Sequence, residues 1–286
     1  MTTPDAAASG TYSIGGDLVV NRLGYGVMQL PGAGVWGPSP DPENAVHVLR
    51  RAVELGVTLI DTADSYGPFI ADLLIKGALH PYSDDLVIAT KVGFTRQGPN
   101  RWIPVGRPEY LRQQVELNLR HLGLERLDLL QLHRIDPKVA LEDQLGELVA
   151  LQQEGKIRHL GLSEVSVDEL KAAQKLATIV SVQNLFNVAS RDSEPLLDYA
   201  EANDIAFIPW FPLATGKLAK PGSTLDALAT KHGVSASQLA LAWLLARSPV
   251  ILPIPGTSNL DHVEDNVAAA LLELTEAEVA EIASAA

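Results

Sequence analysis

Residues 57–67 read VTLIDTADSYG, and this stretch decides the fold. Its apolar first part predicts a short buried strand, and Asp61 and Tyr66 follow directly after it. The same order returns twice further along the chain, because Lys91 and His133 each close another apolar run. Three strand-like segments thus each deliver an ionisable group at their C-terminal end. In a parallel β/α barrel these ends converge on one face, which is where active sites lie.

Outward from this stretch, strand-like and helix-like segments alternate along the whole chain. Strands are predicted at 22–27, 57–61, 86–91, 127–132, 157–162, 179–183, 205–210 and 250–254. Helices are predicted at 43–55, 69–79, 109–122, 139–154, 166–177, 194–202, 225–231, 237–246, 260–270 and 276–283. Such alternation in 286 residues predicts an α/β protein with the (β/α)8 TIM-barrel fold. We expect one domain over 1–286, with 1–10 flexible and a hairpin over 11–20 that plugs the N-terminal end of the barrel.

Three predicted connections are longer than the rest, at 29–42, 93–107 and 211–223. All of them follow strands, so we expect them on the C-terminal face of the barrel, where long ordered loops build binding sites. Trp36, Phe94 and Trp102 lie in two of these loops and predict an aromatic substrate pocket. Arg96 and Arg101 either meet an anionic group there or are simply solvated.

Composition excludes several classes of protein. The formal net charge is −13 and the isoelectric point about 4.9, which argues against binding to nucleic acid or to an anionic membrane. The chain has no cysteine, so disulfides and zinc–thiolate sites are impossible, and no metal site is predicted. No apolar run approaches the ~20 residues of a membrane span, and a cytoplasmic location is expected.

The four ionisable residues suit proton transfer to a carbonyl oxygen. Free tyrosine titrates near ~10, and a nearby ammonium such as that of Lys91 favours the tyrosinate. Asp61 would keep the lysine charged and fixed, and His133 could donate a hydrogen bond to the carbonyl oxygen. The alternative is that Asp61 and Lys91 form a structural ion pair and that Tyr66 only packs.

The chain resembles the aldo-keto reductase superfamily over about residues 18–268. The segments that carry the resemblance are Asp61-Thr62-Ala63-x-x-Tyr66-Gly67, Lys91, Leu132-His133, Gly161-Leu162-Ser163, Gln183-Asn184, Pro212-Leu213-Ala214-x-Gly216-x-Leu218 and Ile254-Pro255-Gly256-Thr257-Ser258. The resemblance implies an NAD(P)H-dependent carbonyl reductase. It implies that Tyr66 is the general acid, that Lys91 and Asp61 tune it, and that His133 orients the carbonyl group.

The resemblance also implies a cofactor site for NADPH, with NADH as the alternative. The implied contacts are Ser163, Glu164 and Gln183 to the carboxamide, Trp210 stacked on the nicotinamide, Pro212, Leu213, Gly216, Lys217 and Leu218 around the pyrophosphate, and Gly256, Thr257, Ser258, His262 and Asn266 toward the adenosine phosphate. Two positions depart from the common pattern. Glu164 replaces an asparagine and cannot donate to the carboxamide oxygen. His262 replaces the arginine that binds the 2′-phosphate, which leaves the preference between NADPH and NADH open.

The resemblance implies that the substrate is a small carbonyl compound. Segments 21–26, 28–30 and 81–86 are similar to a bacterial branch that includes pyridoxal reductases, so pyridoxal or another aromatic aldehyde is the first substrate to try. A monomer is the favoured state. The main alternative is a regulatory subunit that senses nicotinamide nucleotides and has weak reductase activity. A further alternative is a lyase in which Lys91 forms a Schiff base.

Overall fold

A curved parallel sheet forms the centre of the computed structural model, which describes residues 3–213 and 224–284. Within these residues the sheet order is β11-β10-β9-β8-β5-β4-β3, and every neighbouring pair is parallel. The strands are β3 (Tyr25–Gly26), β4 (Leu59–Asp61), β5 (Val87–Val92), β8 (Leu127–Leu132), β9 (Ile157–Ser163), β10 (Ile179–Gln183) and β11 (Ala206–Phe207). The predicted (β/α)8 fold is confirmed.

The eighth predicted strand, 250–254, is corrected by the structure. It makes only an isolated parallel bridge between Phe207 and Ile251. On its other side the Gly24 N–H donates to the Pro253 oxygen at 2.9 Å. Pro253 has no N–H of its own and interrupts the ladder, so the segment closes the barrel without forming a regular strand. Closure is tight, since a Cβ at Gly256 would lie 2.5 Å from the Gly26 oxygen.

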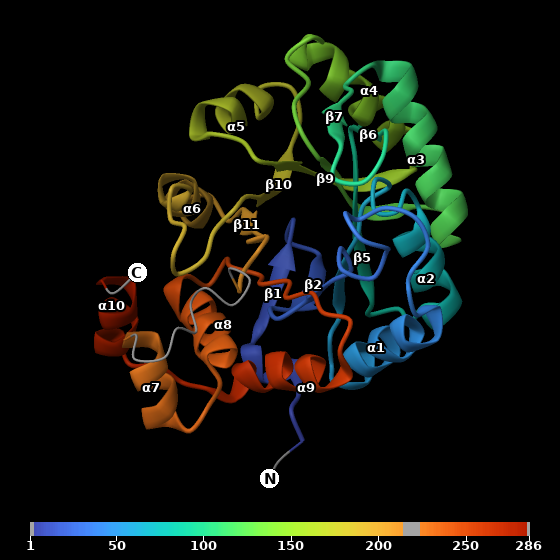
Figure 1. Cartoon of the computed structure of the whole chain (residues 1–286). Coiled ribbons are helices and arrows are strands. Elements are labelled where there is room, and N and C mark those ends of the chain that lie inside the picture. The colour runs from blue at the N-terminus through green and yellow to red at the C-terminus, as the bar shows by residue number, and fades with distance from the viewer. Residues whose placement is uncertain (1–2, 214–223, 285–286) are drawn as a thin grey trace.

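Helices cover the outside of the sheet, as Figure 1 shows. They are α1 (Pro42–Glu54), α2 (Ile70–Leu79), α3 (Pro108–Leu122), α4 (Leu141–Gln153), α5 (Val167–Ala173), α6 (Glu194–Ala202), α7 (Thr224–His232), α8 (Ala236–Arg247), α9 (Leu260–Ala268) and α10 (Glu276–Ser284), with short 3-10 helices η1 (Ala6–Ser9) and η3 (Ala269–Leu271). The capping box predicted for Ser166 and Glu169 is present at the start of α5. In the described ranges no helix has the length and apolar character needed to cross a membrane.

An antiparallel hairpin of β1 (Thr11–Ile14) and β2 (Leu18–Asn21) fills the N-terminal end of the barrel, as predicted. Ile14, Leu18 and Val20 pack there against side chains from the starts of the parallel strands, and all are buried. The neighbouring segment expected to be flexible contains η1, in which Ala6 is buried and its N–H donates to the Leu55 oxygen at 2.8 Å. The hairpin therefore supplies part of the interior core of the barrel.

The predicted long loops differ from one another. Residues 93–107, predicted as a long loop, contain the antiparallel pair β6 (Phe94–Arg96) and β7 (Trp102–Pro104), in which Arg96 lies opposite Trp102. Of the predicted loop 29–42, residues 29–41 connect β3 to α1 with only an isolated bridge between Trp36 and Gly67, and Pro42 already belongs to α1. In the loop that begins at Phe211, residues 214–223 lie outside the described part of the chain, and with them Gly216, Lys217 and Leu218.

Candidate active site

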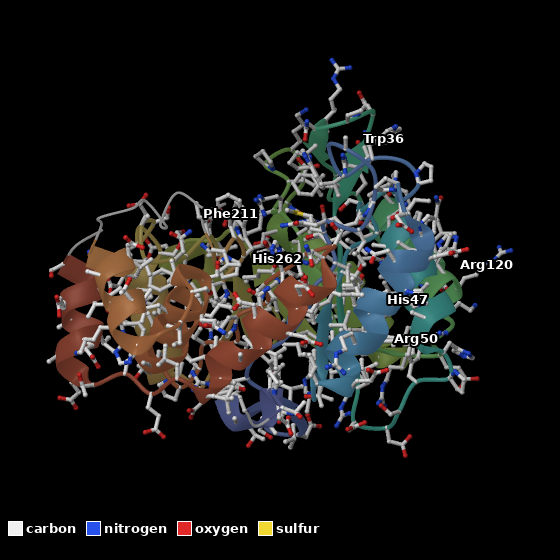
Figure 2. All side chains as sticks on the ribbon, turned by 60° about the horizontal axis from the view of Figure 1, so that its bottom comes forward. Trp36, His47, Arg50, Arg120, Phe211 and His262 are labelled. Carbon is white, nitrogen blue, oxygen red and sulfur yellow. The ribbon has the colours of Figure 1, made fainter. Side chains whose placement is uncertain are left out.

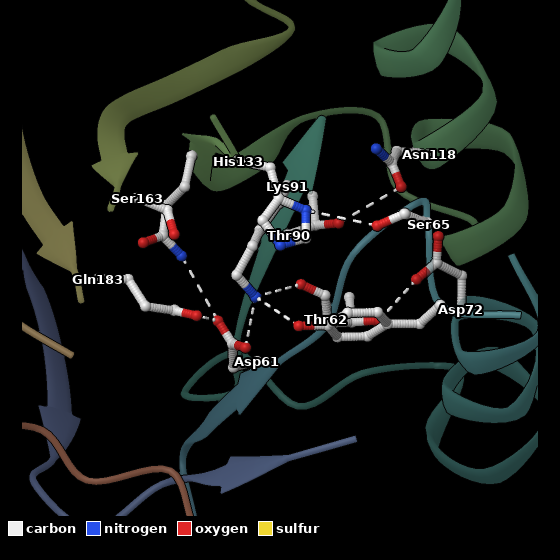
Figure 3. Close-up of polar contacts among 12 residues, drawn as sticks. Asp61, Thr62, Ser65, Asp72, Thr90, Lys91, Asn118, His133, Ser163 and Gln183 are labelled. Carbon is white, nitrogen blue, oxygen red and sulfur yellow. Dashed lines mark hydrogen bonds and ion pairs between the residues drawn. The ribbon is translucent and has the colours of Figure 1, made fainter. Parts of the chain in front are cut away.

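The four predicted catalytic side chains lie together at the C-terminal ends of β4, β5 and β8. Figure 3 labels three of them, Asp61, Lys91 and His133. The Lys91 ammonium is at the centre of the group. Its Nζ lies 2.5 Å from Asp61 Oδ1 and 3.4 Å from the Tyr66 hydroxyl, and it also donates to the Thr62 oxygen at 2.9 Å. All three of its amine protons thus have an acceptor. Lys91 is completely buried, so this charge is held in place with no access to water.

Burial and the neighbouring charges act in opposite directions on this pair. Burial raises the pKa of Tyr66, and the Lys91 ammonium lowers it without outweighing burial. From the sequence we predicted only that Lys91 lowers the pKa of Tyr66. The net rise of that pKa in the structure corrects this expectation. Burial lowers the pKa of Lys91, but Asp61 and Tyr66 more than compensate, and the pKa lies above its ordinary value. At neutral pH the phenol is therefore protonated and the amine charged, which is the state of a proton donor with a fixed cation beside it.

The His133 ring lies edge-on to the Tyr66 ring and contacts the Ser65 hydroxyl. Its Nδ1 lies 3.4 Å from the Ser65 hydroxyl, and its ring centroid lies 6.1 Å from that of Tyr66. Burial, followed by the charges of Lys91 and Arg134, holds the pKa of His133 well below its usual range. The imidazole is therefore neutral at physiological pH, and a neutral imidazole can still offer one N–H to a carbonyl oxygen.

Asp61 is fixed by residues from two further strands. Its Oδ2 accepts from Gln183 Nε2 at 2.9 Å and from Gln131 Nε2 at 3.4 Å. The resemblance assigned Gln183 to the cofactor, but here part of its amide holds the Asp61 carboxylate. Gln131 was not predicted. The sequence feature that could have identified Gln131 is its position in β8, two residues before His133 and on the same face of the strand.

Two further buried acids, Asp64 and Asp72, lie close to the catalytic group. Asp72 Oδ1 accepts from the Thr62 hydroxyl at 2.8 Å (Figure 3), whereas the buried Asp64 carboxylate has only weak contacts with the Ser65 N–H and hydroxyl. Burial raises the pKa of Asp72 to about 7. Burial, followed by the charge of Asp72, also raises the pKa of Asp64 well above its usual range. Sequence reasoning did not identify this pair, although Asp64 lies inside the stretch that decided the fold.

A cavity of about 910 Å³ runs from the catalytic group to the start of α9. Most of the predicted site residues in the described part of the chain line it. They are Asp61, Tyr66, Phe94, Trp102, His133, Ser163, Gln183, Trp210, Pro212, Leu213, Gly256, Thr257, His262 and Asn266. Lining residues that were not predicted include Met28, Asn100, Arg134, Ser235, Ser237 and Asp265. A cavity of this size can hold most of a large ligand.

Besides the completely buried Lys91, three predicted residues do not line the cavity. Trp36 does not line the cavity and instead lies 5.8 Å from the Arg96 guanidinium, in the loop that bridges to Gly67. Ser258 also lies outside the lining, and its oxygen accepts from Asn44 Nδ2 at 2.7 Å. Glu164 has a left-handed backbone with φ of 54°. It directs Oε1 at the Trp210 Nε1 at 2.5 Å and at the Leu185 N–H at 2.7 Å.

Arg96 holds the substrate side of the cavity together. Its guanidinium lies 3.5 Å from the Trp102 ring centroid and donates to the backbone oxygens of Val35 and Ser65 at 2.8 and 2.6 Å. It therefore ties the β6–β7 hairpin to the loop before α1 and to the segment that carries Tyr66. Of the two roles left open for this arginine, neither anion binding nor simple solvation describes these contacts.

The far end of the cavity is polar and carries no lysine or arginine among its described lining residues. His262 projects from α9 (Figure 2), and its Nδ1 lies 3.4 Å from the Thr257 hydroxyl. Asp265 Oδ2, one turn further along α9, accepts from the Ser235 hydroxyl at 2.7 Å. This end thus offers hydrogen bonds and a carboxylate, with no fixed positive charge in the described part of the chain.

Known proteins share both the sequence and this architecture. A sequence model described as the Aldo/keto reductase family matches residues 22–286. An uncharacterized oxidoreductase of Schizosaccharomyces pombe is 53% identical over 271 residues, which cover 95% of this chain and 88% of the relative. Pyridoxine 4-dehydrogenase of Escherichia coli is 44% identical over 275 residues, covering 94% and 96%. The crystal structure of an aldo-keto reductase from Klebsiella pneumoniae in complex with NADPH superposes with a TM-score of 0.82 at 26% identity, covering 99% and 94%.

Proposed function

The chain belongs to the aldo/keto reductase family and is an NAD(P)H-dependent oxidoreductase, and we propose that it reduces an aldehyde or ketone to an alcohol with Tyr66 as the proton donor. The observation that carries the proposal is the buried group of Asp61, Lys91, Tyr66 and His133 at one end of the large cavity. At neutral pH Tyr66 is protonated, Lys91 is charged and His133 is neutral, as this reaction needs, because of the directions in which their pKa values are shifted.

The residues along the cavity fit a nicotinamide dinucleotide. Ser163 and Gln183 offer polar groups beside the catalytic end, and Trp210 is half-buried with its ring open to the cavity. Thr257, Asn266 and His262 line the other end. When bound, the cofactor supplies the hydride that is added to the carbonyl carbon. We propose NADPH as the cofactor. NADH is the alternative, because the described lining near His262 lacks a permanent cation that would bind a 2′-phosphate.

The protein side of the reaction follows from the geometry of the buried group. The carbonyl oxygen accepts hydrogen bonds from the Tyr66 hydroxyl and the neutral His133 imidazole, which fixes the carbonyl plane. As the carbon receives the hydride, Tyr66 gives its proton to the oxygen and becomes a phenolate. Lys91 stabilises that phenolate from 3.4 Å, and Asp61 keeps the lysine charged after burial has removed its water. Tyr66 regains a proton when the alcohol leaves and water enters.

The substrate end favours a planar ring. Trp102 lies edge-on to Tyr66 with centroids 6.3 Å apart, and Phe94 lies 4.6 Å from the His133 ring. These rings form walls that suit an aromatic aldehyde. Together with the similarity to the pyridoxine dehydrogenase of Escherichia coli, they support pyridoxal as the first substrate to test.

The test is a panel of carbonyl substrates with both cofactors. Pyridoxal, benzaldehyde and a short aliphatic aldehyde should each be followed by loss of the NADPH or NADH absorbance, with steady turnover that depends on enzyme concentration. Cofactor binding without turnover of any member would favour the regulatory-subunit alternative. Loss of activity after borohydride treatment with substrate, with label on Lys91, would favour the Schiff-base lyase. A monomeric state and a cytoplasmic location belong to the proposal and can be tested by light scattering and cell fractionation.

A further inference from the structure

Arg134 is a cation that lines the cavity and has no role in the proposed proton transfer. It follows His133 directly and is the one lysine or arginine among the described residues that line the cavity. Its Nη1 donates to the His133 backbone oxygen at 2.7 Å and to the Ser163 hydroxyl at 3.1 Å. Its Nε and Nη2 have no acceptor in the described part of the chain. Among the described residues, two donor groups of this half-buried guanidinium thus have no partner beside the catalytic end.

No carboxylate among the described residues approaches Arg134 to within the 4.0 Å of an ion pair. Glu164 acts on it only through space, because its Oε1 is directed at Trp210 and Leu185. Residues 214–223 contain no Asp or Glu, so that segment cannot supply a carboxylate partner. Burial lowers the pKa of Arg134, which is the direction expected of a cation that has lost water without gaining a counterion. Arginine nonetheless stays charged.

A partly buried charge is costly unless something pairs with it. Arg96 shows how this chain treats an arginine with a structural role, because its donors are occupied by the backbone oxygens of neighbouring loops. Arg134 lines the cavity, and among the described residues its Nε and Nη2 lack such partners. Phe94 packs against both the Arg134 guanidinium, at 5.6 Å, and the His133 ring, at 4.6 Å, so the cation and the carbonyl-orienting group share one aromatic wall.

We propose that Arg134 binds an anionic oxygen of the substrate, so that the preferred substrates are carbonyl compounds that also carry a carboxylate or a phenolate. This inference rests on the proposed reduction at Tyr66 and adds the class of substrate. Two forked N–H groups suit an oxyanion better than a neutral ester or ether oxygen. Pyridoxal, whose ring carries an acidic hydroxyl next to its aldehyde, belongs to this class.

The test compares an acid with its ester at equal size. The kcat/KM values of 3-carboxybenzaldehyde and of its methyl ester are measured with NADPH for the wild type, Arg134→Gln and Arg134→Lys. We expect the wild type to prefer the acid, and Arg134→Gln to reduce the acid-to-ester ratio by about 10- to 100-fold. Arg134→Lys should retain part of the preference. Arg112→Gln is the matched control, because Arg112 pairs with Glu147 and Glu154 on the surface, and the ratio should not change.

The outcomes separate this inference from the proposed function. A wild-type ratio near one, or a preference that persists in Arg134→Gln, overturns the inference while reduction of the ester still supports the reductase. If Arg134→Gln weakens NADPH binding about 10-fold without changing the ratio, Arg134 serves the cofactor through Ser163 and the inference is wrong. If no aldehyde is reduced, binding of benzoate and of benzamide to the NADP⁺ complex decides. Tighter binding of benzoate that is lost in Arg134→Gln supports an anion site, and equal binding refutes it.

Discussion

The roles of the buried Lys91–Asp61 pair in catalysis and in stability can be separated by comparing a single variant with a double variant. Lys91→Met removes the ammonium that lies 2.5 Å from Asp61 Oδ1 and leaves a carboxylate that is only 2 % exposed. The remaining partners of that carboxylate are the amides of Gln183 and Gln131, of which only the first is close, at 2.9 Å. Removing one member of a buried pair costs ~3–5 kcal/mol. We expect Lys91→Met to lose that amount of stability and to lose turnover by at least ~10²-fold.

The variant to compare with Lys91→Met is the double variant that combines Asp61→Asn with Lys91→Met. It buries no net charge, and the asparagine can still accept from Gln183, so we expect it to recover most of the lost free energy of unfolding. It should not recover turnover, because Tyr66 still lacks its cation. Urea unfolding, followed by circular dichroism at pH 7.5, measures the first quantity, and single-turnover reduction of an aldehyde measures the second.

The pH dependence provides an independent readout from the same variants. Burial raises the pKa of Tyr66 and Lys91 opposes that rise, so removing Lys91 should raise the pKa further. Oxidation of the alcohol needs the phenolate, and its rate therefore rises with pH through the pKa of Tyr66. In Lys91→Met that rise should move to higher pH. The reasoning fails if Lys91→Met loses less than ~1 kcal/mol, if the double variant is no more stable than the single one, or if the profile does not move.

Four further changes test separate parts of the site. Tyr66→Phe should reduce turnover by at least ~10²-fold while NADPH binding, measured by fluorescence, stays unchanged; a variant with near wild-type kcat would exclude Tyr66 as the proton donor. Trp210→Ala should weaken cofactor binding by ~1 kcal/mol and free the Glu164 carboxylate; unchanged binding with a large loss of thermal stability would show that the ring only packs. His262→Arg should raise the NADPH-to-NADH affinity ratio at pH 7.5 by up to ~1.5–3 kcal/mol; a strong NADPH preference that the change does not alter would place the 2′-phosphate at other residues. Asp72→Asn should stabilise the protein at pH 8 by a few kcal/mol, at about 1.4 kcal/mol per pKa unit, and less at pH 5. The sign follows because the folded carboxyl, with its pKa raised to about 7, stays protonated where the unfolded one ionises, so wild-type stability falls as pH rises from about 4 to 7. Equal stabilisation at both pH values would show that this group does not titrate as described.

The sequence predicted the elements that have one strong physical cause. β8 and α6 have the predicted bounds, because an uninterrupted apolar run and a helix between clear end signals leave little freedom. The meeting of Asp61, Lys91 and His133 was predictable since parallel strands end on one face. The segment 250–254 was not, because its apolar pattern hides the effect of Pro253 on a backbone ladder.

Side-chain partners drawn from distant strands were the part that could not be predicted. Gln183 bonds to Asp61 across 122 positions of sequence, and Arg134 bonds to Ser163 across 29. Which rotamer each adopts depends on what the neighbouring strand places opposite, and local sequence carries no record of that. The same holds for Glu164, whose left-handed backbone turns its carboxylate toward Trp210.

The N-terminal hairpin and the closing segment have a consequence for the order in which the chain can fold. Asp17 in the hairpin turn contacts His159 at 2.6 Å, and Arg22 donates to the Ser248 oxygen at 2.6 Å, 226 positions later. The hairpin is synthesised before these partners, so its contacts cannot be completed until the segment around Ser248 has been made. Contacts so distant in sequence slow folding, because a long loop must close before they form. Until that segment has been made, Ile14, Leu18 and Val20 lack part of the core in which they are buried, so aggregation of the nascent chain depends on the hairpin and the closing segment together.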